Sequence, residues 1–477
     1  MKKIFKYLLT FVMAKTINVC PIFANESEKI NFSLQSTVYD DGEAIDTIIL
    51  NISELNIDEN RITKDMFNIT AQSSTVYTDE QEKEFFGKDS KHGLQHLGLY
   101  GPTSRNVESV DIKEGKIILH LSMNDNGKGT LDFTANTTTF KGCNSLMNIV
   151  YTIDPVKLPL KNGTIVEFEF EQNKDNGIQN NEIEKFTAGE SNGLKYQFYA
   201  PKNANDGKKH PLIVWFHGGG ESGYRGLHYN NISQLKANRG AVSLVTDEAQ
   251  DIFDGAYVLA PQTPHEWSEN LVETKALIDK IVSENNIDKN RIYAYGCSAG
   301  GYMVLDMVVH NPNFFAAAVA TCPAIDQQNI NTYGQGRKIT DDELKAINTP
   351  IWVVQAKDDT TVKYEESALR VYNLLKDKGA ILTTYETGGH SSWIHTAKNE
   401  PDNNGEHVWQ WTAKQILTVS QIATQPSETT NSSQENTSVK PVKTGDTSKV
   451  EYYVIIGIIS ASLLALYVLK KEKVLYH

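Results

Sequence analysis

The chain has 477 residues, of which 40% are hydrophobic and 22% are charged, so it can bury cores of normal size in two or three domains. Its formal net charge of −13 at pH 7 argues against nucleic acid as a partner, because phosphate binding needs a basic surface. The four cysteines, Cys20, Cys143, Cys297 and Cys322, show neither zinc-ligand spacing nor a dense disulfide framework.

The first 24 residues have the pattern of a secretory signal peptide. Three lysines precede an apolar stretch at residues 7–14, and the small residue Ala24 offers a cleavage site. We therefore expect residues 1–24 to be removed and the mature protein to lie outside the cell. Cleavage would also remove Cys20, and we expect Cys297 and Cys322 to be buried free thiols.

Residues 27–190 have the pattern of short β-strands. Apolar or alternating stretches recur at residues 47–50, 116–121 and 166–170, and clusters of Asn, Asp and Gly separate them. The pattern predicts an all-β sandwich domain of immunoglobulin type. No motif with chemistry accompanies it, so a spacer or a module for homo-oligomer formation fits this region better than a carbohydrate-binding one.

Residues 191–421 alternate between strand-like and helical patterns, which predicts a mostly parallel sheet with helices on both faces. Ligands of such sheets bind at the carboxyl ends of the strands. The expected strands are residues 212–216, 256–260, 291–295, 315–321, 351–355 and 381–385, and the expected helices are 271–282, 299–310 and 409–420.

The C-terminal part has the pattern of a tether and an anchor. Residues 422–450 are mainly Ser, Thr, Asn, Gln and Lys, with few apolar side chains to bury, which predicts a disordered linker. Residues 452–469 are apolar and uncharged and are long enough to span a bilayer. The lysines in residues 470–477 indicate a cytoplasmic tail. We therefore expect a surface protein anchored by this transmembrane segment.

Residues 441–446, Pro-Val-Lys-Thr-Gly-Asp, stand just before the span. The motif, the span and the basic tail together resemble a Gram-positive cell-wall sorting signal, which a sortase cuts between Thr and Gly. The usual motif is Leu-Pro-x-Thr-Gly, and here Pro441 and Val442 occupy its first two positions. The resemblance implies an extracellular protein held at the membrane or, after sortase processing, at the wall of a Gram-positive bacterium.

The sequence Gly296-Cys297-Ser298-Ala299-Gly300 fits the nucleophile-elbow pattern G-x-S-x-G. That motif needs a strand before the serine and a helix after it, and both are expected here. The glycines suit the sharp turn, because a Cβ on either side would crowd it. Ser298 is therefore the candidate nucleophile.

A glycine-rich loop, His217-Gly218-Gly219-Gly220, follows the expected strand 212–216. Such a loop can direct backbone N–H groups at an oxyanion, with a further donor from the residue after the nucleophile. The candidate oxyanion donors are the N–H groups of Gly219, Gly220 and Ala299. We expect Glu221 to support the loop rather than act on substrate.

The order of the triad in this fold is serine, acid and then histidine. Asp358 and Asp359 both follow the expected strand 351–355 and are the candidate acids. His390 follows the strand 381–385 on a glycine-rich loop and is the candidate base. His395 and His407 are its rivals, but neither follows a strand end so directly.

The chain from residue 211 to about residue 420 resembles esterases of the prolyl-oligopeptidase and polyhydroxybutyrate-depolymerase-like branch of the α/β hydrolases. The likeness is strongest to secreted bacterial esterases with an N-terminal immunoglobulin-like domain. The matching stretches are residues 215–221, 259–262, 295–302 and 389–393, with 41–44 and 62–67 in the front domain. The resemblance implies an α/β-hydrolase fold and a serine triad. Proteins of this branch are often labelled peptidases, so the likeness leaves the substrate open.

The resemblance also separates the two candidate acids. In that family a Val stands three positions after the acid, and Val362 stands three after Asp359. The family often has a His-Gly pair before the acid, where this sequence has Gln355-Ala356. The resemblance therefore implies Asp359 as the residue that orients His390.

These patterns together predict a hydrolase that cleaves carboxylic esters, small or linked to polysaccharide, through an acyl-enzyme. No metal or cofactor is expected. Trp267 and Trp393 are candidates to line the substrate cleft, although core positions fit them equally well. Only residues 325–348 separate the sixth strand from the acid strand, so no large lid is expected. The alternatives are a serine peptidase of the prolyl oligopeptidase type and a non-catalytic, glycan-binding surface protein.

Overall fold

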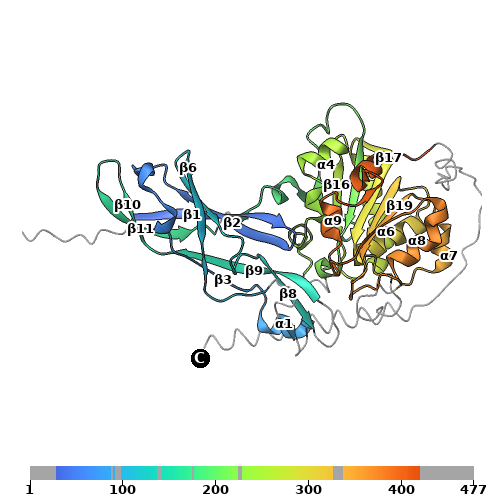
Figure 1. Cartoon of the computed structure of the whole chain (residues 1–477), viewed down its shortest axis with the longest axis horizontal. Helices are drawn as coiled ribbons and strands as arrows, with labels where there is room; N and C mark the ends of the chain where they lie inside the picture. The colour runs from blue at the N-terminus through green and yellow to red at the C-terminus, as the bar shows by residue number, and fades with distance from the viewer. Residues whose placement is uncertain are drawn as a thin grey trace, which may run out of the picture. The chain divides into compact units, whose positions relative to one another are not determined.

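The computed structural model describes residues 28–86, 90–91, 98–136, 142–174, 177–223, 228–325 and 337–418 (Figure 1). The predicted signal peptide, linker, sorting-like motif, transmembrane segment and tail lie outside these ranges, as does part of the 325–348 stretch that bears on a lid. Within these ranges, no helix combines the length and the apolar character that crossing a membrane requires.

The first part of the chain forms two β-sheets. The described strands of the larger sheet run in the order β10 (Val156–Pro159), β11 (Ile165–Gln172), β1 (Glu28–Tyr39), β2 (Gly42–Asn51), β7 (Lys116–Leu121) and β6 (Val107–Lys113), with β12 (Ile178–Gln179) beside β1. The smaller sheet has the order β4 (Ser90–Lys91), β8 (Leu131–Asn136), β9 (Gly142–Ile153), β3 (Ile69–Thr75) and β5 (Thr103–Arg105).

Apolar side chains of the two sheets pack together in one shared core. Strand β7 alternates between buried and more exposed positions, and Ile117, Leu119 and Leu121 all point into the core. Ile69 and Tyr151 of the smaller sheet belong to the same cluster. The prediction of a β-rich region is confirmed, while its assignment to the immunoglobulin type stays a prediction.

The second part of the chain is built on one mostly parallel sheet. In the described residues its order is β13 (Thr187–Ser191), β14 (Leu194–Tyr199), β16 (Tyr257–Gln262), β15 (His210–Phe216), β17 (Ile287–Cys297), β18 (Ala317–Thr321), β19 (Ile351–Ala356) and β20 (Ile381–Tyr385). In this order, neighbouring strands from β16 to β20 are parallel to each other, whereas β14 is antiparallel to both of its neighbours, β13 and β16. The sheet therefore begins at Thr187, slightly before the predicted boundary at residue 191.

Helices cover both faces of this sheet, as the continuous apolar strands predicted. All of β15 is buried, with Leu212 and Val214 packed in one cluster and Ile213 and Trp215 in another. The first cluster includes residues of α5 (Leu271–Glu284), α6 (Ala299–His310) and α8 (Ala368–Leu375). The second includes residues of α3 (Gly240–Ser243), α4 (Asp247–Ile252) and α10 (Val408–Ala413). This arrangement is the α/β-hydrolase architecture that the sequence predicted.

The predicted closing helix at residues 409–420 is too long. Helix α10 ends at Ala413, and further along the chain Leu417 is buried and its N–H donates to the carbonyl of Asn290 at 3.0 Å. A continuing helix would have used that N–H internally. Tertiary packing against β17 therefore ended the helix earlier than its periodicity indicated.

The β-rich part and the α/β part are joined by partly buried polar contacts. Lys236 of α2 (Ser233–Lys236) forms a 2.7 Å ion pair with Glu43 of β2, whose side chain is fully buried. Arg239 forms a 3.0 Å ion pair with Glu182. The two parts therefore share an interface that includes these two charge pairs.

Candidate active site

Ser298 lies in the turn between β17 and α6. Its φ of 54° and ψ of −116° are rare for a residue with a side chain, which marks a strained position. A Cβ on Gly300 would lie 1.9 Å from the carbonyl oxygen of Phe216, and one on Gly296 would lie 2.5 Å from that of Gly300. Only glycine at these positions lets α6 approach the sheet closely enough to hold the serine in this turn.

The structure brings the three predicted triad residues together. Nε2 of His390 lies 2.9 Å from Oγ of Ser298, and Nδ1 of His390 lies 2.8 Å from Oδ2 of Asp359. Ser298 follows β17, Asp359 follows β19 and His390 follows β20. Neighbouring parallel strands end at the same edge of the sheet, which is why residues so far apart in sequence meet there.

The rival residues have other partners. The carboxylate of Asp358 accepts from the N–H groups of Gly388 and Gly389, at 3.2 and 2.8 Å, and so supports the loop that carries His390. His395 pairs with Glu400 and stacks on Tyr385. The hydrogen bond to Ser298 therefore comes from His390 and not from His395.

The surroundings of Asp359 keep it ionised. Burial by itself would raise its pKa, but the hydrogen bond and charge of His390 and the N–H groups of Val362 and Thr361, both at 2.9 Å, lower the pKa below its usual value. Gln355 also donates to its carboxylate at 3.1 Å. A carboxylate held in this way can orient the imidazole and stabilise its protonated form.

His390 is tuned in the opposite direction. Burial by itself lowers its pKa, but the neighbouring Cys322 sulfur and the Asp359 carboxylate favour the imidazolium, and the net pKa of His390 is raised above its usual value. Trp393 packs edge-on against the ring at 5.5 Å between centroids. The site therefore favours the protonated histidine that forms when the serine gives up its proton.

Cys322 is a site residue that the sequence did not reveal. It is buried, has a φ of 37° and follows β18 at the same edge as Asp359 and His390. Ligand atoms of these three side chains lie within 4.8 Å of one another, the one such group of possible metal ligands among the described residues. The two nitrogens of His390 already contact Ser298 and Asp359, which fits proton transfer better than metal binding.

The glycine loop after β15 is held by His217. This side chain is fully buried, and burial lowers its pKa to about 4, so the ring is neutral. Its Nε2 accepts from the N–H of Thr263 at 3.1 Å, so Nδ1 carries the proton and donates to the carbonyl of Gly218 at 2.6 Å. His217 therefore fixes the orientation of the peptide that leads into Gly219.

The predicted oxyanion donors come from two neighbouring segments. A Cβ on Gly219 would lie 4.0 Å from that of Ala299, so the loop runs beside the start of α6. Within the described ranges, the N–H groups of Gly219, Gly220 and Ala299 have no main-chain acceptor. The N–H of Ala299, at the start of the 12-residue helix α6, is suited to a developing negative charge, and the loop N–H groups of Gly219 and Gly220 lie beside it.

The two predicted substrate-binding tryptophans differ. Trp267 is 1% exposed, packs on Phe216 at 5.4 Å between ring centroids and donates through Nε1 to the carbonyl of His217 at 3.0 Å. Its ring is a core residue that supports the glycine loop, so the predicted substrate contact is wrong for Trp267. Trp393 is half-buried beside His390, and its contact with substrate stays a prediction.

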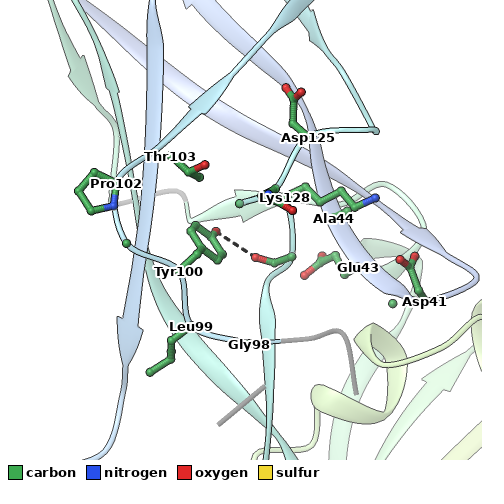
Figure 2. Close-up of a pocket in the computed structure, with 15 residues that line it drawn as sticks. Asp41, Glu43, Ala44, Gly98, Leu99, Tyr100, Pro102, Thr103, Asp125 and Lys128 are labelled. Atoms are coloured by element: carbon green, nitrogen blue, oxygen red, sulfur yellow. Dashed lines mark hydrogen bonds between the residues drawn. The ribbon is translucent and has the colours of Figure 1, made fainter. Parts of the chain in front are cut away.

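A pocket of about 580 Å³ in the β-rich region is lined by residues 41–44, 98–103 and 125–129. Figure 2 shows these residues. The hydroxyl of Tyr100 donates to the carbonyl of Gly129 across it at 3.1 Å. None of the triad or oxyanion residues lines this pocket. It is therefore separate from the candidate active site.

Comparisons with known proteins agree with this fold. Residues 267–336, which include the turn at Ser298, match the model of the prolyl oligopeptidase family. A thermostable esterase of known structure is similar with a TM-score of 0.60 and 24% identity, covering 82% of this chain and 100% of that chain. This likeness shows the α/β-hydrolase fold.

Two further solved structures are more distant. Est1E from Butyrivibrio proteoclasticus has 17% identity and a TM-score of 0.34, covering 45% of this chain and 95% of that chain. The acylaminoacyl peptidase of Pyrococcus horikoshii has 16% identity and a TM-score of 0.35, covering 62% of this chain and 54% of that chain.

Proposed function

We propose that this chain is a serine hydrolase that cleaves carboxylic esters through an acyl-enzyme on Ser298. The observation that carries the proposal is the continuous hydrogen-bonded path from Ser298 through His390 to Asp359, at 2.9 and 2.8 Å. The strained turn at Ser298 and the N–H groups beside it supply the other parts that acyl transfer needs.

In the proposed reaction, Nε2 of His390 takes the proton of Ser298 as Oγ attacks the ester carbonyl. The negative charge on the carbonyl oxygen is stabilised by the N–H groups of the glycine loop and of Ala299. The imidazolium, stabilised by Asp359, then gives its proton to the leaving alcohol. Water, deprotonated in the same way by His390, releases the acid and restores Ser298.

The preference for esters rests on the part of the chain before the catalytic sheet. Its described strands form two sheets with a common core. A propeller that screens peptides by size would need several four-stranded blades around a channel. An amine leaving group must also be protonated in place, which is more demanding than release of an alcohol. The match to the prolyl oligopeptidase family model keeps a peptidase as the second candidate.

We propose that the enzyme acts at the cell surface. This part of the proposal rests on the sequence patterns of residues 1–24 and 452–469. Deleting residues 441–477 should release active protein into the medium. Recovery of the intact chain from the cytosol, with residues 1–24 attached, would contradict a surface location.

The substrate class is tested with matched compounds. A fluorophosphonate probe should label the wild-type protein, because only an activated serine reacts with it, whereas a glycan-binding protein without such a serine would stay unlabelled. The values of kcat/KM should then be compared for short-chain aryl and feruloyl esters and for prolyl and non-prolyl anilides. We expect the best ester to exceed every anilide, and the reverse order would favour the peptidase.

A further inference from the structure

The β-rich region contacts the candidate oxyanion loop directly. Nδ2 of Asn144, on β9, donates to Oε1 of Glu221 at 2.6 Å, and Glu221 ends the short helix η5 (Gly219–Glu221). Asn144 is 6% exposed and Glu221 is 5% exposed, so solvent has little access to this bond. Among the described residues, Oδ1 of Asn144 has no hydrogen-bond partner, so the bond to Glu221 is what orients the amide.

The contact also reaches the main chain of the loop. A Cβ on Gly220 would lie 2.9 Å from Nδ2 of Asn144 and 3.3 Å from Cε2 of Phe133, which is on β8. Gly220 is one of the candidate oxyanion donors. Its peptide therefore rests against two side chains from the β-rich region, and packing this close leaves it little freedom to move.

Glu221 connects Asn144 to the remainder of the loop. The N–H of Glu221 donates to the carbonyl of Gly218 at 3.4 Å, which closes the turn over Gly219 and Gly220. Its carbonyl oxygen accepts from Nε2 of Gln262 at 2.8 Å. Gly219 and Gly220 therefore lie in a turn whose last residue, Glu221, is held by Gln262 through its main chain and by Asn144 through its side chain.

We propose that Asn144 is a positioning residue for the hydrolase reaction, which holds the N–H groups of Gly219 and Gly220 at the oxyanion position by way of Glu221. The inference rests on the proposed function. It assigns the β-rich region a part in forming the active site. Removing Asn144 would leave a buried carboxyl group without its side-chain donor, and the loop would rearrange to find another.

The test compares Asn144→Ala with Asn148→Ala. Asn148 is exposed on the same strand and donates to the carbonyl of Thr75 at 3.1 Å, so it is a matched control. The readouts are kcat and KM on an aryl acetate, and the Ki of an aryl trifluoromethyl ketone, which adds to a reactive serine and places an oxyanion against the loop. We expect Asn144→Ala to lower kcat roughly 10–100-fold with little change in KM, because a small displacement of donors acts in the transition state.

The ketone separates positioning from general damage. Its Ki should rise by the factor by which kcat/KM falls, since both measure stabilisation of the oxyanion. A variant that is only unstable would lose active protein without changing the Ki of the part that remains. Asn148→Ala should match the wild type in all three values.

A second variant keeps the test valid if Asn144→Ala does not fold. Asn144→Asp places two carboxyl groups in contact and should lose most activity, and adding Glu221→Gln should recover at least about tenfold in kcat by restoring an amide–carboxylate pair. A folded Asn144→Ala protein with wild-type kcat and Ki, or no recovery in the double variant, would overturn the role of Asn144. Wild-type protein without Ser298-dependent ester hydrolysis would instead overturn the proposed function, and this role with it.

Discussion

Asp358 and Asp359 are adjacent in sequence but hold two different parts of the histidine loop. Asp359 contacts Nδ1 of His390 at 2.8 Å, whereas Asp358 accepts from the main chain of Gly388 and Gly389. One aspartate therefore orients the imidazole and the other supports the turn that carries it. The two carboxylates make separable contributions to the same site.

Asn substitutions distinguish these contributions. Asp359→Asn should lower kcat by about 10⁴, because the amide favours the wrong tautomer of His390 and removes the charge that stabilises the imidazolium. Asp358→Asn keeps one acceptor oxygen for the loop and should lose far less. Steady-state kinetics of both variants on one aryl ester checks this, and a larger loss at Asp358 would reverse the two assignments.

The surroundings of His390 predict a pH profile. The imidazole must be neutral to accept the serine proton, so kcat/KM should fall as the pH falls through the pKa of His390. Because that pKa is raised, the midpoint should lie above the usual value for histidine, which is about 6.5. Cys322→Ala removes one of the groups that raise it and should move the midpoint down. An unchanged or higher midpoint in this variant would show that the sulfur does not act on His390.

Glu221 predicts a dependence of stability on pH. Burial raises the pKa of Glu221 from 4.5 to about 7, against the opposing hydrogen bonds of Asn144 and the loop N–H groups. Between these two values the folded state holds a proton that the unfolded state has lost, so this group makes the free energy of unfolding fall as the pH rises. The stabilisation is complete below the pKa of the unfolded chain and is lost as the pH rises to the pKa of the folded one.

Glu221→Gln removes this titration. Relative to the wild type, the variant should therefore gain stability as the pH increases from about 5 to about 8. Urea unfolding of both proteins at the two pH values measures the difference. Glu169→Gln, at an exposed position of β11, is the control and should show no such trend. A parallel pH dependence in wild type and Glu221→Gln would contradict the prediction.

The ion pair of Lys236 and Glu43 predicts that the contact between the two parts of the chain contributes to the free energy of unfolding. Lys236→Met leaves the buried Glu43 carboxylate without its cation and should lower the free energy of unfolding by about 3–5 kcal/mol near neutral pH. The loss should shrink in mild acid, where Glu43 can take up a proton. Thermal unfolding detects the change. Lys202→Met breaks an exposed pair with Asp247 and should leave the Tm unchanged.

Local sequence patterns predicted the strands and the helix that carry the candidate triad. The helix at residues 299–310 has its predicted bounds. Gly300 allows the close approach to the sheet at its start, and the apolar residues after it are buried along its length. Strands 351–355 and 381–385 were also predicted closely, and they carry Asp359 and His390 to the same edge of the sheet. Order along the chain therefore indicated the triad before any distance was known.

Contacts made across the fold could not be predicted in this way. Asn144 lies on a strand of the β-rich region without any motif, and its relation to Glu221 depends on how the two parts pack. Cys322 carries no signal beyond its place after a strand. The sequence left both a core position and a substrate contact open for Trp267, because it does not show which side of the glycine loop packs against the hydrophobic core.

The most direct test of the account is the kcat of Ser298→Ala on an aryl ester that the wild type hydrolyses. The covalent route requires Oγ of Ser298, so kcat should fall by roughly 10⁴–10⁶ while the remaining oxyanion donors leave a small residual rate. The double variant with His390→Ala should be little worse, since nucleophile and base act as one unit. A Ser298→Ala protein with activity within about tenfold of the wild type would contradict the central claim.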